Sequence, residues 1–389
     1  MKRVKNKNDP EKGDGDGLSS SLTHDLIEEI LARLPSKTLV KFTVVSKLWS
    51  STIRSKYFID TYLKQSLSRR RFLFTFPGDR IRLFHSISRS QEASQTRRSS
   101  IPMSPDERVY LRTYDITPPV RGLICVQDWR KVVISNPSTG QFLVLPKVRT
   151  RRRGIHRFFG YDPIRDEYKV LCMTVLQELQ FRGPIVSEDH QVFTLNGDQT
   201  KKKEATWRKI RCELPHCPVT KGVCSNGVVY YGAWPNTDKE ESLVVAFDVR
   251  LEKFTPVKLP VGVEIHTTGF DLVSYQRKHV ALVNQSKKGE FEMWVLEDVG
   301  KARWSKISLV VPSWNGLAGR NRRNSFCCRG VVSSGEFIFS PVAYCNGQFR
   351  IISYNREEDI ARSVEIEGLG ENLSSVSVFL DYGECPVII

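Results

Sequence analysis

One repeated pattern, visible from residue 119 onward, constrains the fold of this chain more than any other feature. In each copy an apolar strand meets a short turn rich in Asn, Asp, Pro or Gly, and a second strand follows. Each gap between copies contains another strand pair, so one unit holds about four strands. The turn residues of successive copies are 60, 52, 50 and 57 residues apart; they are Asn136, Asn196, Asp248, Asp298 and Asn355.

A period of about 50 residues with four strands per unit is typical of a kelch-like β-propeller. Five units are visible, and strand-like residues 72–86 and 374–384 are left over at the two ends. Pairing these ends would complete a sixth blade and cover both open edges. The sequence therefore predicts a mainly antiparallel, six-bladed propeller-like domain over residues 70–389. An irregular β-sandwich built from the same hairpins is the alternative, and Ser-rich residues 88–107 are expected to form a flexible loop.

A short helical segment, residues 20–65, precedes the strands, which makes the predicted fold class α+β. Its opening stretch, LTHDLIEEILARLP, places apolar residues on one helical face and stops at Pro35. Ser36 and Ser46 are expected to cap the next two helices, and a fourth periodic stretch covers residues 58–67. So small a unit has more large apolar residues than its own core can use. The surplus is expected to face the neighbouring domain or another protein.

The helical segment resembles an F-box over residues 18–64. Thr23 stands where the family usually has Pro, and Thr43 where it often has Arg, but neither departure removes an apolar anchor. The resemblance rests on an ordered set of matches: Leu22, Asp25, Leu26, Glu29, Ile30, Leu31, Leu34, Pro35, Leu39, Phe42, Val45, Ser46, Lys47, Trp49 and Phe58.

F-boxes bind the Skp-type adaptor of SCF-type cullin–RING ubiquitin ligases, so the resemblance implies that partner here and, through it, the cullin and RING proteins. Two other interpretations of the helical segment stay open: a unit that only packs against the next domain, and a helix-turn-helix DNA reader, whose third helix is too poor in basic residues. The adaptor-binding residues that the resemblance implies are Leu22, Leu26, Ile30, Leu31, Leu34, Pro35, Leu39, Phe42, Val45 and Trp49.

The strand region is similar to the F-box-associated domain of plant F-box proteins. The similarity is carried in order by residues 121–126, 134–146, 159–171, 206–210, 227–234 and 244–254. With the F-box, it implies a non-catalytic substrate receptor of a ubiquitin ligase, without a cofactor, whose β domain binds a protein target. The similarity does not identify that target or the residues that bind it.

A propeller enzyme or small-molecule receptor, with the helical segment as an appendage, is the alternative function. No nucleophile elbow, HExxH, Walker loop or glycine-rich nucleotide fingerprint occurs in the sequence. Cys212, Cys217 and Cys224 surround His216, but their spacing matches no common zinc pattern. No metal site is therefore predicted.

The formal net charge of +16 is spread over several runs rather than one recognition element. The basic runs lie at residues 68–71, 150–157, 200–203 and 319–323, between strand-like segments. They are expected to be solvated loops and to suit a target with an acidic face; direct nucleic-acid binding is not favoured. Residues 1–17 are expected to be a disordered, charged lead-in without a secretory signal, and no membrane span is expected. Nine cysteines in such a chain favour reduced thiols in the nucleus or cytoplasm.

Overall fold

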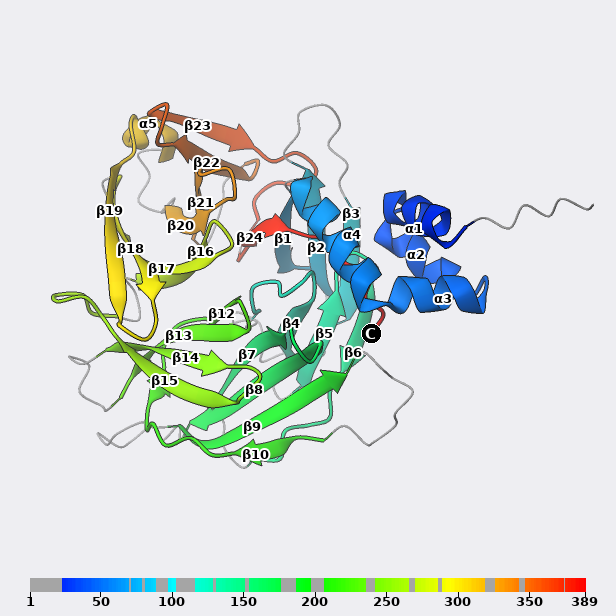
Figure 1. Ribbon diagram of the computed structural model, residues 1–389. Helices are drawn as coiled ribbons and strands as arrows, with labels where there is room; N and C mark the ends of the chain where they lie inside the picture. Colours follow the sequence, from blue (N-terminus) through cyan, green and yellow to red (C-terminus); the bar gives the residue numbers. More distant parts are fainter. Residues whose placement is uncertain are drawn as a thin grey trace, which may run out of the picture.

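The computed structural model places a helical module beside one part of a larger β domain (Figure 1). Residues 1–22, which include the predicted lead-in and Leu22, lie outside the described residues. The structure describes residues 23–69, 71–78, 81–88, 97–102, 116–128, 131–150, 154–175, 187–196, 206–235, 242–265, 270–285, 289–318, 326–342, 347–373 and 375–389.

The helical module consists of α1 His24–Arg33, α2 Ser36–Phe42, α3 Lys47–Arg54 and α4 Lys56–Ser68. The predicted cap at Ser46 is confirmed, because its hydroxyl accepts the Trp49 N–H at 3.1 Å. The predicted cap at Ser36 is wrong. Pro35, with φ −61° and ψ 142°, takes the extended N-cap position, so Ser36 becomes the first residue of α2. The core of the module contains Ile27, Leu31, Ala32, Leu39, Ile53, Phe58 and Tyr62.

The first sheet of the β domain joins the two ends of the domain, as the leftover strands predicted. Its antiparallel order is β24–β1–β2–β3, and β1 pairs with β24 from Arg71 opposite Tyr382 to Thr75 opposite Ser377. The bounds are β1 Arg71–Pro77, β2 Ile81–Ser88, β3 Arg97–Pro102 and β24 Ser377–Tyr382.

Three further antiparallel sheets follow along the chain. One has the order β4–β5–β6, the next β10–β9–β8–β7, and the third is built on β13 and β14 with β11, β12 and β15. Their strands are β4 Ile124–Asp128, β5 Lys131–Asn136, β6 Gln141–Val144, β7 Gly154–Asp162, β8 Glu167–Val175, β9 Ser187–Asn196, β10 Arg208–Ile210, β11 Cys217–Pro218, β12 Val223–Ser225, β13 Val228–Trp234, β14 Leu243–Asp248 and β15 Lys253–Lys258.

The last sheet has eight strands, but it is two antiparallel meanders, β16–β19 and β20–β23, joined by a short parallel contact between β16 and β20. The propeller-like, mainly antiparallel arrangement is confirmed. Within the described residues, the predicted six blades correspond to six meanders, whereas hydrogen bonding joins them into five sheets. A short helix, α5 Trp314–Ala318, links the two halves; the strands are β16 Phe270–Tyr275, β17 His279–Gln285, β18 Glu290–Asp298, β19 Arg303–Val310, β20 Phe326–Val331, β21 Phe337–Pro341, β22 Arg350–Asn355 and β23 Ile360–Glu365.

The repeated turns share one hydrogen-bonding scheme. The Asp248 carboxylate accepts the N–H groups of Arg250 and Leu251 at 2.9 and 2.7 Å, and the other turns repeat this contact in whole or part. We call the Asn or Asp whose side chain accepts these bonds the anchor of its turn. Four residues after each anchor the backbone enters the left-handed region, which disfavours residues with a side chain. The anchors whose bonds are resolved are Asn136, Asp162, Asp248, Asp298 and Asn355, and the left-handed residues are Gly140, Asp166, Glu252, Ala302 and Asp359.

Hydrogen bonds from tryptophan indoles connect neighbouring meanders. Trp304 of β19 donates its indole N–H to the carbonyl of Lys258 in β15 at 2.9 Å. Trp207, beside β10, donates to the carbonyl of Pro146, which follows β6, at 2.6 Å. These bonds complement apolar clusters that bridge sheets, such as the one that joins Ile134 of β5 to Val170 of β8.

The predicted loop at residues 88–107 is wrong for residues 97–102, which form β3. The pairing with β2 explains the difference, because Ile101 lies opposite Arg82 and its side chain is buried. A single buried apolar residue in a polar stretch gives a weak strand signal, and the backbone ladder supplies the rest. Ser88 ends β2, and residues 89–96 and 103–107 lie outside the described residues.

Candidate interaction surfaces

The predicted adaptor-binding residues separate into a buried set and an exposed set. Leu31 and Leu39 are fully buried in the core of the module, so they support its fold and cannot touch a partner directly. Leu34, Phe42 and Trp49 are half-buried against that core. The exposed members are Leu26, Ile30, Pro35 and Val45.

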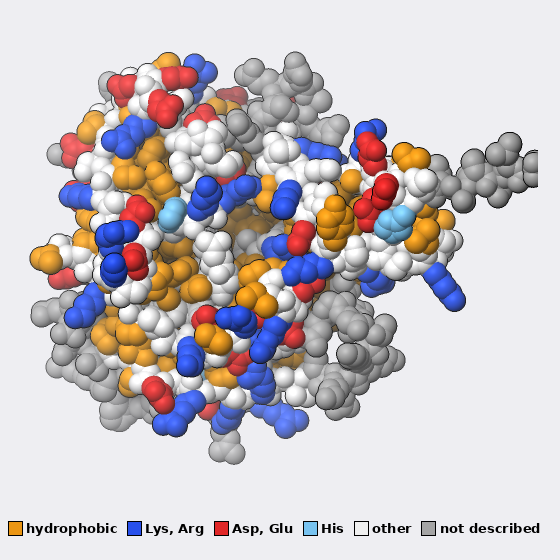
Figure 2. All heavy atoms as spheres, viewed as in Figure 1, with side chains coloured by type: hydrophobic (Ala, Val, Ile, Leu, Met, Phe, Trp, Pro, Cys, Tyr) orange, Lys and Arg blue, Asp and Glu red, His pale blue; other side chains and the backbone are white. Residues whose placement is uncertain are grey.

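The exposed apolar residues gather in two places. Leu26 and Ile30 lie one turn apart on α1, where the fractional exposure of Ile30 is 44%. Val44, which is 87% exposed, stands with Val45 and Leu48 at the turn from α2 into α3. We call these five residues the apolar face of the module; exposed hydrophobic side chains on the module are visible in Figure 2. The sequence did not predict Val44 and Leu48 as adaptor-binding residues, although both are apolar and lie close to Val45 in the chain.

Helix α4 joins the module to the β domain, and we call its contacts with that domain the seat of α4. The Lys56 ammonium donates to the carbonyl of Pro163, and Asp60 pairs with Arg121, whose guanidinium lies 4.4 Å from the centroid of the Tyr161 ring. The predicted F-box boundary at residue 64 falls inside this helix. Helix α4 continues past it to Ser68, shortly before β1 begins at Arg71.

The buried residue Glu384, after β24, contacts both α4 and the first sheet. It pairs with Arg71 at 3.3 Å and with Arg97, and its backbone N–H donates to the Ser66 hydroxyl of α4 at 2.7 Å. A side chain added at Gly383 would approach the Leu67 side chain to 3.0 Å, which is tighter than an ordinary contact. The residues after β24 therefore hold α4 closely against the first sheet.

Tyr62 ties α4 to the rest of the module. Its hydroxyl donates to the carbonyl of Leu34 at 2.9 Å, between α1 and α2. Burial, more than the nearby Glu384 charge, raises the pKa of Tyr62 to about 12, so the phenol keeps its proton at physiological pH. One helix thus carries both the seat on the β domain and the packing that supports the apolar face.

The basic runs are not all solvated loops, contrary to the sequence prediction. Arg71 lies in β1 and Arg157 in β7, and both side chains are buried. Arg71 forms an ion pair with Glu384. The two residues are 313 positions apart, so no local pattern in the sequence reveals the pair. Residues 151–153, 200–203 and 319–323 lie outside the described residues.

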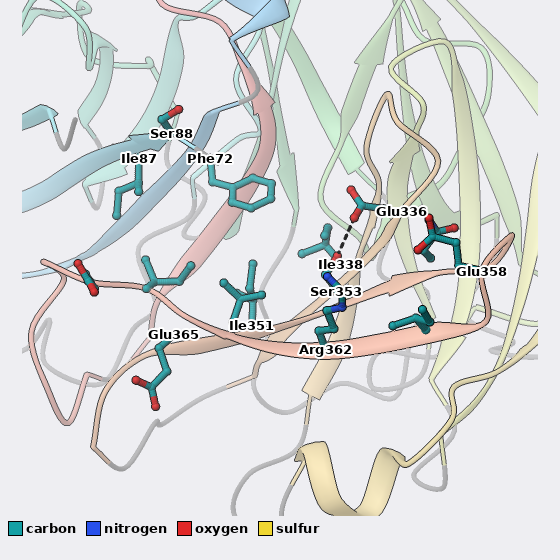
Figure 3. A pocket seen from close by; sticks show the side chains of 15 residues that line it. Phe72, Ile87, Ser88, Glu336, Ile338, Ile351, Ser353, Glu358, Arg362 and Glu365 are labelled. Atoms are coloured by element: carbon teal, nitrogen blue, oxygen red, sulfur yellow. Dashed lines mark hydrogen bonds between the residues drawn. The ribbon is translucent and has the colours of Figure 1, made fainter. Parts of the chain in front are cut away.

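A groove of about 510 Å³ opens between β1–β2 and the sheet face of β21–β23 (Figure 3). Figure 3 shows Phe72 and Ile87 facing this space from one side, and Ile338 and Ile351 from the other. The carboxylates of several glutamates also line this groove. We call it the interblade groove; the further residues that line it are Ser88, Glu336, Ser353, Asn355, Glu358, Ile360, Arg362, Val364, Glu365, Ile366 and Glu367.

A buried Ser–His pair in β9 bears on the alternative of an enzyme. The Ser187 hydroxyl donates its proton to the carbonyl of His216 at 2.8 Å. His190 Nε2, 3.0 Å from the same oxygen, must then donate to it rather than withdraw its proton. Burial, with the nearby His216, lowers the pKa of His190 to about 4. This arrangement satisfies buried polar groups and does not activate the serine.

His216, at the centre of the cysteine cluster, has both ring nitrogens engaged. Nδ1 lies 2.6 Å from the carbonyl of Leu214, and Nε2 lies 2.8 Å from the Tyr231 hydroxyl. Within the described ranges, no three His, Cys, Asp or Glu side chains are grouped so that they could hold a metal ion. None of the helices described is long and apolar enough to cross a membrane.

Comparisons with known proteins agree with this arrangement of parts. Residues 19–61 match the F-box domain, and residues 71–383 match the F-box associated beta propeller domain. An F-box/kelch-repeat protein of Arabidopsis thaliana is 38% identical, with 95% of this chain and 94% of that protein aligned. The F-box protein DOR of the same plant is 34% identical over 92% of each chain.

Likeness to solved structures is much weaker. An apocarotenoid oxygenase of Synechocystis aligns with 77% of this chain and 78% of its own at 9% identity and a TM-score of 0.39, too low to support any functional argument. The two family matches cover most of the chain, and the Arabidopsis relatives align over nearly their full length. This chain therefore belongs to the plant family of F-box proteins that carry an F-box-associated β-propeller domain.

Proposed function

We propose that this protein is a substrate receptor of an SCF-type cullin–RING ubiquitin ligase, with no catalytic activity of its own. The observation that carries the proposal is the apolar face of the module, which stays exposed although the module has a packed core. An interface with the Skp-type adaptor would remove Leu26, Ile30 and Val45 from water, and burial of a large apolar side chain stabilises by about 1.5–3 kcal/mol.

The seat of α4 supports the same function. A receptor of this kind works by proximity, because it holds its target near a ubiquitin-charged enzyme that other subunits supply. The Asp60–Arg121 ion pair, the bond from Lys56 to the carbonyl of Pro163, and the bond between Ser66 and the backbone N–H of Glu384 fix the module against the β domain. A fixed seat keeps the distance between adaptor and target defined, which raises the effective concentration of the target. The complex would act in the nucleus or the cytoplasm.

The proposal is tested in plant cells under proteasome inhibition, with the full-length protein and a Leu26→Asp/Ile30→Asp variant. Both should capture the same targets. Only the wild type should also capture adaptor and cullin, and only its targets should carry ubiquitin. If targets of the variant carry as much ubiquitin as those of the wild type, the receptor proposal is wrong.

A further inference from the structure

The interblade groove carries a charge opposite to that of the chain as a whole. The chain has 59 Lys and Arg against 43 Asp and Glu. Four glutamates line the groove, whereas Arg362 is the one basic side chain among its described lining residues. Within the described residues, no ion pair joins Glu358, Glu365 or Glu367 to a basic group. Such carboxylates attract cations and repel phosphates.

The floor of the groove is apolar, which a bound metal ion would leave uncovered. Phe72 and Ile351 are buried at its base, and Ile360 and Val364 of β23 are 40% and 41% exposed. Ile360 is the first residue of β23 and Val364 lies within the strand, and both are paired with β22, so their exposure is not that of a loop tip. The occupant therefore needs aliphatic groups as well as positive charge.

The wall strand β23 favours an extended occupant. It pairs with β22 through the register Asn355 opposite Ile360 to Arg350 opposite Glu365, and no strand among the described residues pairs with its other edge. Successive side chains of a strand point to opposite faces, so every second residue shares a face. Ile360, Arg362 and Val364 therefore project together into the groove. An extended peptide can align its own alternating side chains with such a wall.

We propose that the interblade groove binds an extended segment of the target protein in which Lys or Arg alternates with branched aliphatic residues. This inference rests on the proposed receptor function and assigns a chemistry to its target. It replaces the expectation of an acidic target face at this site, because the lining of the groove has four glutamates and, among its described residues, one arginine. Nucleic acid and anionic lipid do not fit, since their phosphates would meet the glutamates.

The test measures fluorescence anisotropy with the full-length protein, alone and mixed with its adaptor, and a labelled short peptide of alternating lysine and valine. The peptide should bind saturably and more weakly as salt rises. Glu365→Gln/Glu367→Gln should weaken binding by about threefold to tenfold, the range expected for two solvent-exposed charges. Val364→Ser should weaken it at unchanged charge. The matched control, Glu213→Gln/Glu290→Gln, alters two exposed glutamates outside the groove and should leave binding unchanged.

Three results would overturn the inference: no saturable binding of the lysine–valine peptide, equal binding of a glutamate–valine peptide, or equal weakening by the control variant. Failure here is distinct from failure of the receptor function. If the peptide does not bind but adaptor capture and target ubiquitination persist, only the groove assignment falls. If the peptide binds but no adaptor is captured, the receptor function falls and the groove remains.

Discussion

The helical module and the β domain both expose apolar side chains, but in different settings. In the β domain, Ile164 and Leu251 stand at the tips of two repeated turns and Val261 stands in another turn, apart from one run in the edge strand β6, Phe142 to Val144. In the module, Val44, Val45 and Leu48 crowd into five consecutive positions, and Leu26 and Ile30 share a face of α1. Isolated apolar residues at turn tips are ordinary on protein surfaces, whereas a gathered set marks an interface.

The two regions also differ in what stabilises them. The β domain has six apolar clusters, most of which span neighbouring meanders, while the module has one small cluster. The stability of the module therefore depends on α4 and its contacts with the β domain. We expect the isolated module to have a lower free energy of unfolding than the isolated β domain. This contrast separates residues that fold the module from residues that bind its partner.

The largest effect is expected at Glu384, the buried residue of the β domain that lies against α4. Glu384→Ala would leave Arg71 buried without its carboxylate, and breaking a buried ion pair in this way costs about 3–5 kcal/mol. Urea unfolding should show the loss. Glu29→Ala, which breaks the exposed pair with Arg33, is the control and should cost less than about 1 kcal/mol. Comparable losses would mean that the buried Glu384–Arg71 pair does not stabilise the fold.

The next effect separates two neighbours on α1. Leu31→Ala removes a fully buried side chain and should lower the free energy of unfolding of the module by about 2–5 kcal/mol. Ile30→Ala removes an exposed one and should leave thermal unfolding almost unchanged while it weakens adaptor binding. Equal destabilisation by the two substitutions would break the distinction between core and face.

This pair also shows what the sequence could reveal. The helical periodicity and family pattern located the module and its apolar residues, but treated Leu31 and Ile30 alike, because both match the motif. Which of them is buried depends on how α1 packs against α3 and α4, and periodicity only gives the face. The repeat of Asn and Asp anchors revealed the turns, since each acts locally. The Glu384–Arg71 pair and the interblade groove join residues far apart in the chain, so no local signal marked them.

A third prediction concerns pH and the β domain. The pKa of His190 is lowered to about 4 in the folded state, below its ordinary value of 6.5, so only the unfolded chain takes up this proton between those values. The stabilisation is complete above pH 6.5 and is lost as pH falls toward 4, by about 3 kcal/mol. Urea midpoints measured between pH 7 and pH 4 should fall less steeply for His190→Gln. An unchanged slope would contradict the burial of a neutral histidine.

The smallest effect is a gain in stability at a repeated turn. Ala302 has φ 48°, a left-handed conformation that costs a residue with a side chain about 1–2 kcal/mol. Ala302→Gly should stabilise the β domain by about 0.5–1 kcal/mol, because the greater freedom of glycine in the unfolded chain offsets part of the relief. Gly140, at the matching position of another turn, is the reverse control, and Gly140→Ala should destabilise. A loss of melting temperature for Ala302→Gly would contradict this account of the turns.

The most direct test of the central claim is the affinity of the purified full-length protein for a plant Skp-type adaptor, measured by isothermal titration calorimetry. Leu26→Asp/Ile30→Asp places two charges on the apolar face, and Val261→Asp/Val310→Asp places the same two charges on exposed valines of the β domain, 105% and 70% accessible. We predict that the first variant loses adaptor binding with its thermal unfolding nearly unchanged, and that the second binds like the wild type. Equal affinity of wild type and both variants would contradict the assignment of the apolar face as the adaptor site.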